Sequence, residues 1–146
     1  MKDVKNHPVI QFYISNNHFG ALLGMDFDVD LPGKVTYRMV VEQRHLAVPT
    51  AAHGGSICSL MDATLGVCAL SEVVREGFVV STIEMKISFI SPGMLGDTLT
   101  GKGTIIKRRK RLLFVEGEIR NQKNELIAAA SGTFNAYPAK KAGLIE

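Results

Sequence analysis

The residues best suited to chemistry lie at the start and in the middle of one apolar stretch, residues 54–74. His53 is followed by the pair Gly54-Gly55, and Asp62 stands eight residues after Gly54. If the stretch is a helix, its first amide N–H groups are unpaired and lie at the positive end of the helix dipole, where they favour an anion or a developing oxyanion. We expect the Asp62 carboxylate to be buried in this apolar helix. A buried carboxylate usually has a partner, a raised pKa or a function.

The spacing of these two features limits how they can meet. Eight residues of helix separate Gly54 from Asp62, which puts them about 12 Å apart along the axis at about 1.5 Å per residue. An aspartate side chain is too short for that distance. If the helix start and the carboxylate serve one reaction, we therefore expect them to come from two copies of the chain, side by side across a two-fold axis.

Alternation of apolar and polar residues predicts an antiparallel sheet around this helix. Residues 25–31 and 35–41 alternate on either side of a Pro32-Gly33 turn, which predicts a hairpin at one edge of the sheet. Four more strands are predicted after the helix, at 79–90, 98–106, 112–119 and 126–134, and a short amphipathic helix at 8–17. One long helix wrapped by a curved six-stranded antiparallel sheet is an α+β architecture.

The length of the chain predicts one domain, residues 1–146, because 146 residues with 46% hydrophobic composition can build one core and leave no room for a second. The ends, 1–7 and 138–146, are expected to be flexible. Between the hairpin and the helix, residues 42–52 lose periodicity and predict a loop, in which His45 is expected to be a surface or loop residue.

Composition excludes several classes of protein. The two cysteines, Cys58 and Cys68, are ten residues apart in the predicted helix and cannot bridge, which favours a reducing, cytoplasmic location. No His, Cys, Asp or Glu cluster has metal-site spacing, so no metal is expected. The apolar run at 8–14 is too short for a signal peptide, and the long helix is interpreted as a core helix, so no membrane partner is expected. A net charge of +3 without an aromatic platform argues against nucleic acid.

The motif His53-Gly54-Gly55, followed by Asp62 two turns into the helix, resembles the hotdog-fold acyl-CoA thioesterases of the phenylacetate-pathway type. Four other pieces of the chain carry the same resemblance in the same order: 23–25 (Leu-Gly-Met), His45, 82–87 (Thr-Ile-Glu-Met-Lys-Ile) and 91–97 (Ser-Pro-Gly-Met-Leu-Gly-Asp). The resemblance implies a hotdog fold, hydrolysis of an acyl-CoA to free acid and CoA, and assembly as a homodimer or a dimer of dimers, the tetramer being what it suggests. Coenzyme A would be part of the substrate, with no other cofactor.

The resemblance also implies roles for particular residues. Asp62 would be the general base or nucleophile, the Gly54 backbone N–H the oxyanion donor, and His53 would shape the carbonyl site. Thr82 would hold a water or the carboxylate across the interface, and Gly55 would contact substrate. The basic tract is typical of a solvated hairpin end, but in a protein that handles coenzyme A it would also neutralise phosphates; its candidate residues are Arg108, Arg109, Lys110 and Arg111.

One position departs from the family pattern and keeps an alternative open. Many relatives carry an asparagine six residues before the motif histidine, and this chain has Ala47. Loss of that polar group favours a second interpretation, a hotdog protein that binds an acyl-CoA or another apolar ligand without hydrolysing it. A hotdog dehydratase or hydratase is disfavoured because its histidine-centred pattern is absent.

Overall fold

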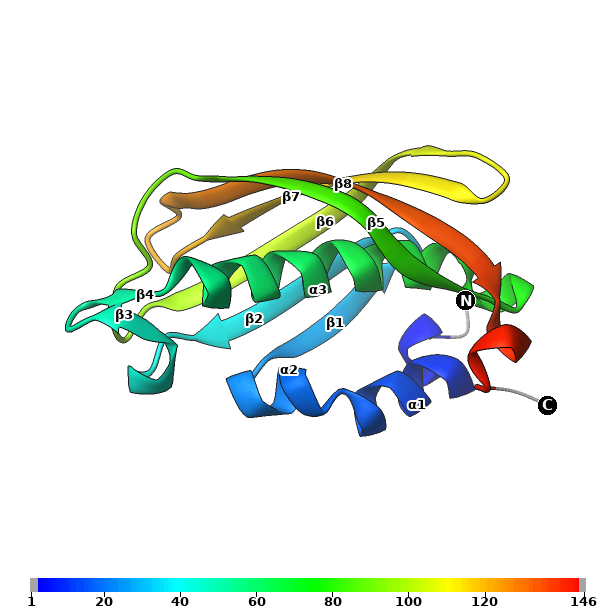
Figure 1. Cartoon of the computed structure of the whole chain (residues 1–146), viewed down its shortest axis with the longest axis horizontal. Helices are drawn as coiled ribbons and strands as arrows, with labels where there is room; N and C mark the ends of the chain where they lie inside the picture. Colours follow the sequence, from blue (N-terminus) through cyan, green and yellow to red (C-terminus); the bar gives the residue numbers. More distant parts are fainter. Residues whose placement is uncertain (1–2, 145–146) are drawn as a thin grey trace.

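The computed structural model describes residues 3–144 and shows one six-stranded antiparallel sheet curved around a long helix, α3 (Gly54–Val73) (Figure 1). The sheet order is β1-β2-β6-β7-β8-β5. This confirms the predicted hotdog architecture and places the β1–β2 hairpin at one edge, as expected. The strands are β1 (Asp26–Leu31), β2 (Lys34–Val40), β5 (Phe78–Phe89), β6 (Thr98–Arg108), β7 (Leu112–Arg120) and β8 (Leu126–Pro138).

The core lies between α3 and the concave face of the sheet. Leu60, Met61 and Leu65 on the inward face of α3 are fully buried. Glycines in the sheet allow the helix to come close, since a Cβ added at Gly101 of β6 would lie 2.4 Å from the Thr64 hydroxyl oxygen. The stretch Gly54–Glu76 is long and apolar enough to cross a membrane, but it is mostly buried inside this fold and is the core helix of the domain.

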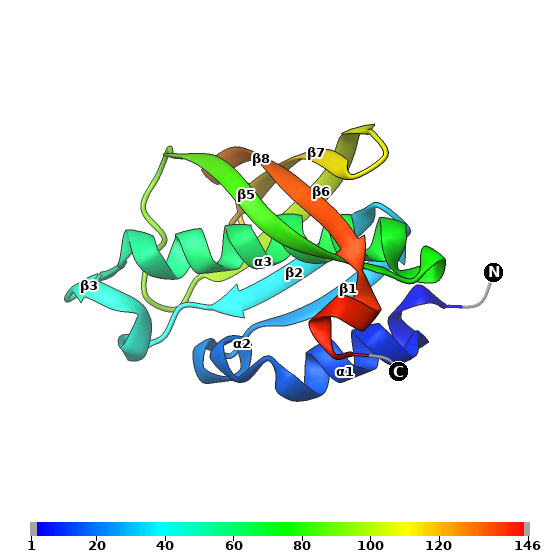
Figure 2. The ribbon, with the colours of Figure 1, turned by 45° about the vertical axis from the view of Figure 1, so that its right-hand side comes forward.

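Two short helices lie along the side of α3 that the sheet leaves open, below it in both views (Figures 1 and 2). The first, α1 (Pro8–Asn16), matches the predicted amphipathic helix. The second, α2 (His18–Leu23), was not predicted. The Asn17 side chain starts α2 by accepting from Gly20 N–H at 3.0 Å, and Gly24 ends it in the left-handed conformation at φ 69°.

The segment before α3 is more ordered than the predicted loop. It holds a 3₁₀ turn, η2 (Gln43–His45), and a small hairpin of β3 (Leu46–Val48) and β4 (Ala51–Ala52). The expectation that His45 is a surface residue is wrong, because its side chain is 1% exposed. Its ring accepts from Glu42 N–H at 2.9 Å and lies 2.8 Å from the Leu23 carbonyl oxygen, so it ties this segment to α2.

Both ends of the described chain are folded, which differs from the expectation of flexible ends at 1–7 and 138–146. Val4, in the 3₁₀ helix η1 (Val4–Asn6), is 5% exposed, and Ala139, in η4 (Ala139–Ala142), is fully buried. The η4 segment follows β8 and lies beside α1 in both views (Figure 2). Residues 1–2 and 145–146 lie outside the described residues.

Candidate active site

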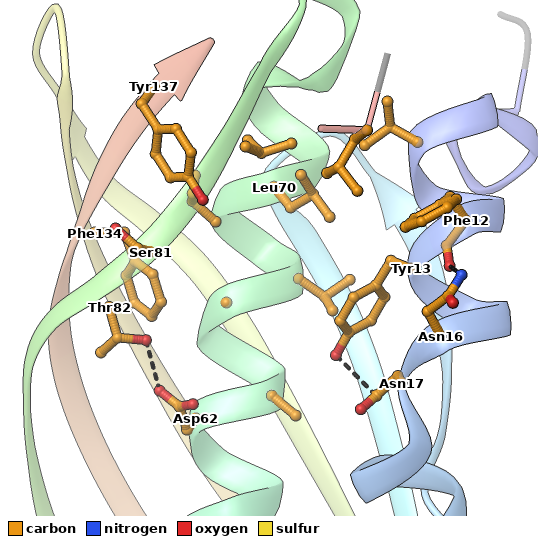
Figure 3. A pocket seen from close by; sticks show the side chains of 17 residues that line it. Phe12, Tyr13, Asn16, Asn17, Asp62, Leu70, Ser81, Thr82, Phe134 and Tyr137 are labelled. Atoms are coloured by element: carbon orange, nitrogen blue, oxygen red, sulfur yellow. Dashed lines mark hydrogen bonds between the residues drawn. The ribbon is translucent and has the colours of Figure 1, made fainter. Parts of the chain in front are cut away.

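Asp62 and Thr82 meet where the middle of α3 passes the edge strand β5. The Thr82 hydroxyl donates to the Asp62 carboxylate at 2.9 Å (Figure 3). The expectation that Asp62 is buried within the apolar helix is wrong for the single chain, since Asp62 lies on the open face of α3 and is exposed. The Thr82–Asp62 hydrogen bond forms within one chain.

A β-bulge sets the direction of the Thr82 side chain. Thr82 pairs with Phe134 of β8, whereas Glu84 pairs with Thr133, so Ile83 is an extra residue in β5. A bulge of this kind bends the strand and redirects the side chains next to it. The alternation of residues 79–90 predicted the strand but gave no sign of the bulge, because its place is set by pairing with β8.

The helix start carries an amide group that is free to bind an anion. His53 is the N-cap of α3, and its Nδ1 accepts from Gly55 N–H at 2.8 Å. A Cβ added at Gly55 would lie 2.9 Å from that nitrogen, so only glycine fits the cap without a shift. Within residues 3–144 the Gly54 N–H has no acceptor. Because it lies at the positive end of a 20-residue helix, it is a donor for a developing negative charge.

One chain does not bring Gly54 and Asp62 together. Both lie on the same unbroken helix, so the eight residues between them correspond to about 12 Å along its axis. The structure therefore assembles half of the predicted site, the Asp62–Thr82 pair, and places the free amide of the same chain two turns away.

Two cavities meet at Asp62. One has a volume of about 430 Å³ and a mainly apolar lining; the other, of about 500 Å³, runs toward the helix start and includes Gly55, Cys58 and Ser59. The residues shared by both surround the point where they join: Tyr13, Asn17, Asp62, Ala63 and Thr82. A ligand bound at Asp62 can thus extend in two directions from the carboxylate.

Tyr13 and Asn17 are residues of this site that the sequence did not reveal. They stand four residues apart on one side of the helical segment and face the cavity opposite Asp62 (Figure 3). Asn17 Nδ2 donates to the Tyr13 hydroxyl at 3.0 Å. Burial raises the pKa of Tyr13, with a smaller contribution from the Asp62 charge, so its hydroxyl stays protonated at neutral pH. The i, i+4 spacing was the available signal, but without the fold it does not say which face meets the cavity.

Cys58 lies close to the site but is not activated. Burial, and to a smaller extent the Asp62 carboxylate, raise the pKa of its thiol. A protonated thiol is a poor nucleophile. Cys58 therefore lines the cavity as a small apolar residue beside the Asp62 carboxylate.

The basic tract lies beside the other end of α3. The Arg108 guanidinium makes two contacts with Glu76, at 2.7 and 2.6 Å, and lies 3.7 Å from Glu72. These contacts hold the pKa of Glu76 below its ordinary value. Because Glu72 is ten residues beyond Asp62 on the helix, the tract is about 15 Å from the carboxylate along the axis. Arg109, Lys110 and Arg111 are exposed at the hairpin end.

The curved sheet around one long helix, with Asp62 on the open side of that helix, is the hotdog architecture. Residues 50–128 match the thioesterase superfamily. The chain therefore belongs to the thioesterase superfamily and is a thioester hydrolase.

Individual relatives agree with this assignment. The chain is 32% identical over 103 residues to acyl-coenzyme A thioesterase 13 of Homo sapiens, covering 70% of this chain and 72% of the relative. It is 27% identical over 117 residues to acyl-coenzyme A thioesterase PaaI of Escherichia coli, covering 80% and 81%. The solved structure of the E. coli PaaI protein from the phenylacetic acid degradation operon superposes with a TM-score of 0.80 at 26% identity, covering 90% and 94%.

Proposed function

We propose that this protein hydrolyses acyl-CoA thioesters at a site shared by two copies of the chain, with Asp62 supplied by one copy and the Gly54 N–H by the other. The observation that carries the proposal is the position of Asp62: exposed on the one open face of α3, fixed by Thr82, and about two turns from an amide with no acceptor among residues 3–144. Names of relatives that include acyl-coenzyme A thioesterase support the substrate class.

The proposed reaction begins with attack on the thioester carbonyl. The Asp62 carboxylate takes a proton from water while the water oxygen bonds to the carbonyl carbon, and the Gly54 N–H donates to the oxyanion that develops. The C–S bond then breaks, and the CoA thiolate takes the proton from Asp62. In the nucleophilic variant Asp62 itself bonds to the carbon, expels the thiolate, and the resulting anhydride is hydrolysed by water. His53, fixed by its bond to Gly55 N–H, shapes the carbonyl site.

Assembly as a homodimer, or a dimer of dimers, brings the two halves of the site together in this proposal. The open face of α3 lies next to the edge strand β5, where Ile83 and Phe89 are 56% and 53% exposed. Exposed apolar side chains on an unpaired edge favour association with another chain. Two antiparallel copies of α3 would place each Gly54 beside the Asp62 of the other chain.

The remaining contacts of coenzyme A are proposed as follows. Gly55 lines the cavity that leads from Asp62 toward the helix start. Arg109, Lys110 and Arg111 are exposed cations for the phosphates, and Arg108 is held beside them by Glu76. No cofactor beyond the substrate takes part. The free thiols of Cys58 and Cys68 support a cytoplasmic location.

Release of free thiol from a panel of acyl-CoAs tests the proposal. Asp62→Asn and Asp62→Ala should lower kcat by about 10²–10⁴-fold, while circular dichroism stays that of the wild type because the side chain is exposed in the chain. Molar mass measured by light scattering checks that each variant still assembles. Wild-type rates in either variant would contradict the role of Asp62. Single-turnover hydrolysis in ¹⁸O-labelled water tests the nucleophilic variant, since label in the Asp62 carboxylate can arise only from an anhydride that water attacks at the Asp62 carbon.

The same assay addresses the non-hydrolysing alternative that Ala47 favours. Saturable binding of acyl-CoA by the wild-type protein without thiol release would support it. Ala47 lies on β3 and lines neither of the two cavities at Asp62, so within one chain the missing asparagine removes no group from the site.

A further inference from the structure

We infer that the 430 Å³ cavity is the acyl pocket, that it takes an apolar acyl group of medium length, and that Gly66 and Leu144 set the length it accepts. The inference rests on the proposed function, because it puts the reacting carbonyl at Asp62. It goes further because it infers the class of acyl group from cavity walls that lie within one chain.

Three segments that run alongside one another form most of the walls, and β8 adds Phe134 and Tyr137. On α3 the lining residues follow one face from Asp62 through Gly66 to Leu70. On β5 the lining runs the opposite way, from Thr82 back to Val79, and on α1 it runs from Asn16 back to Val9. The cavity is therefore a channel parallel to the helix axis, with one end at the Asp62–Thr82 pair (Figure 3).

Polarity changes along this channel. The end at Asp62 has Asn16, Asn17 and Thr82, whose side chains carry hydrogen-bonding groups. The other end is mainly aliphatic, with the Tyr137 side chain beside it (Figure 3); its aliphatic residues are Val9, Val67, Leu70, Val79 and Leu144. A thioester with a hydrocarbon chain has the same order of polarity, since its carbonyl is polar and its tail is not.

The length of the channel limits the acyl group. Asp62 and Leu70 are eight residues apart on α3, about 12 Å along the axis. An extended hydrocarbon chain advances about 1.25 Å per carbon, given C–C bonds of about 1.5 Å, so about eight to ten carbons fill the channel. A volume of about 430 Å³ is also roughly three times that of a cavity known to hold benzene, about 150 Å³.

Gly66 keeps the middle of the channel open. A Cβ added there would meet only the Phe134 ring, at 3.5 Å, which is ordinary contact. A larger side chain at this position must extend into the channel, while alanine is accommodated. Leu144 lies at the apolar end, packed against the core. Truncating Leu144 should lengthen the channel at that end. A larger residue at Gly66 should therefore shorten the longest acyl chain that fits, and a smaller residue at Leu144 should lengthen it.

The test measures dissociation constants of straight-chain acyl-CoAs from butanoyl to palmitoyl by calorimetry, using Asp62→Asn as the background so that turnover does not interfere. Affinity should rise with chain length up to about decanoyl, at about fourfold per buried methylene (about 0.8 kcal/mol), and rise no further. Adding Gly66→Leu should weaken decanoyl-CoA by tenfold or more and leave butanoyl-CoA within about twofold. Gly66→Ala, the matched control, should have a much smaller effect.

Leu144→Ala decides the matter if Gly66→Leu disturbs assembly, because Leu144 is outside α3. Leu144→Ala should increase the acyl chain length at which affinity stops rising. Equal weakening of all acyl-CoAs by Gly66→Leu in a correctly assembled protein, or an unchanged profile with Leu144→Ala, would overturn the pocket assignment. Full thiol release by Asp62→Asn would instead overturn the proposed function, and the binding profile would still report on the pocket.

Discussion

At the scale of single residues, the sequence singled out the candidate carboxylate but not its surroundings. Asp62 stood out because it interrupts an apolar stretch, and the same reasoning expected it to be buried. The structure exposes it because the sheet covers only part of α3. Thr82 was carried over from the family resemblance, and the hydrogen bond to Asp62 within one chain shows what it contacts. Tyr13 and Asn17 could not be found, since their approach to Asp62 depends on how α1 packs.

Thr82 should act by holding the carboxylate in one orientation. Thr82→Val keeps the shape of the side chain and removes the donor, so kcat should fall by about 10- to 100-fold, as expected for the loss of a hydrogen bond to a charged group. Thr82→Ser keeps the hydroxyl and is the matched control. Steady-state thiol release measures both, and equal kcat for valine and serine variants would show that the bond has no role.

At the scale of elements, hydrophobic periodicity predicted the helix and strands whose positions are set by the local sequence. The start of α3 at Gly54 and all six strands of the large sheet were predicted within a few residues, because each carries a clear apolar pattern. The bulge at Ile83, the helix α2 and the β3–β4 hairpin were missed. The bulge and the segment before α3 depend on partners distant in sequence, Phe134 for the bulge and Leu23, which His45 contacts, for the segment.

The ion pair between Arg108 and Glu76 joins the β6–β7 hairpin to the end of α3, and its contribution should depend on pH. Arg108 holds the pKa of Glu76 below its ordinary value near 4.5. The stabilisation is therefore present above pH 4.5 and is lost as pH falls through the lower pKa of the folded state. The melting temperature of Glu76→Gln should be lower than that of the wild type at neutral pH, and the two melting temperatures should become equal in acid.

Glu116→Gln provides the control for this measurement. Glu116 is also exposed, on β7, and has no ion pair among residues 3–144. Its substitution should leave the melting temperature unchanged across the same range. A constant difference between Glu76→Gln and the wild type down to strongly acid pH would contradict the assignment to the ion pair.

At the scale of the whole molecule, the account depends on two copies of the chain. The position of the helix start can be tested without disturbing the fold, because Gly54 is the first residue of α3. Proline is favoured there and lacks the N–H. His53 already has the extended backbone that precedes proline, with φ −63° and ψ 137°. Gly54→Pro should therefore remove the proposed oxyanion donor and lower kcat by about 10²–10³-fold.

Mixing two inactive variants tests the shared site most directly. Asp62→Asn and Gly54→Pro proteins are unfolded together, refolded and assayed for thiol release, with each variant refolded alone as the control. A mixed dimer has one site with both defects and one with an intact Asp62 and an intact Gly54, so random pairing should restore about a quarter of the wild-type activity. Activity no higher than that of the separate variants, in a mixture shown to contain mixed dimers, would contradict the two-chain site.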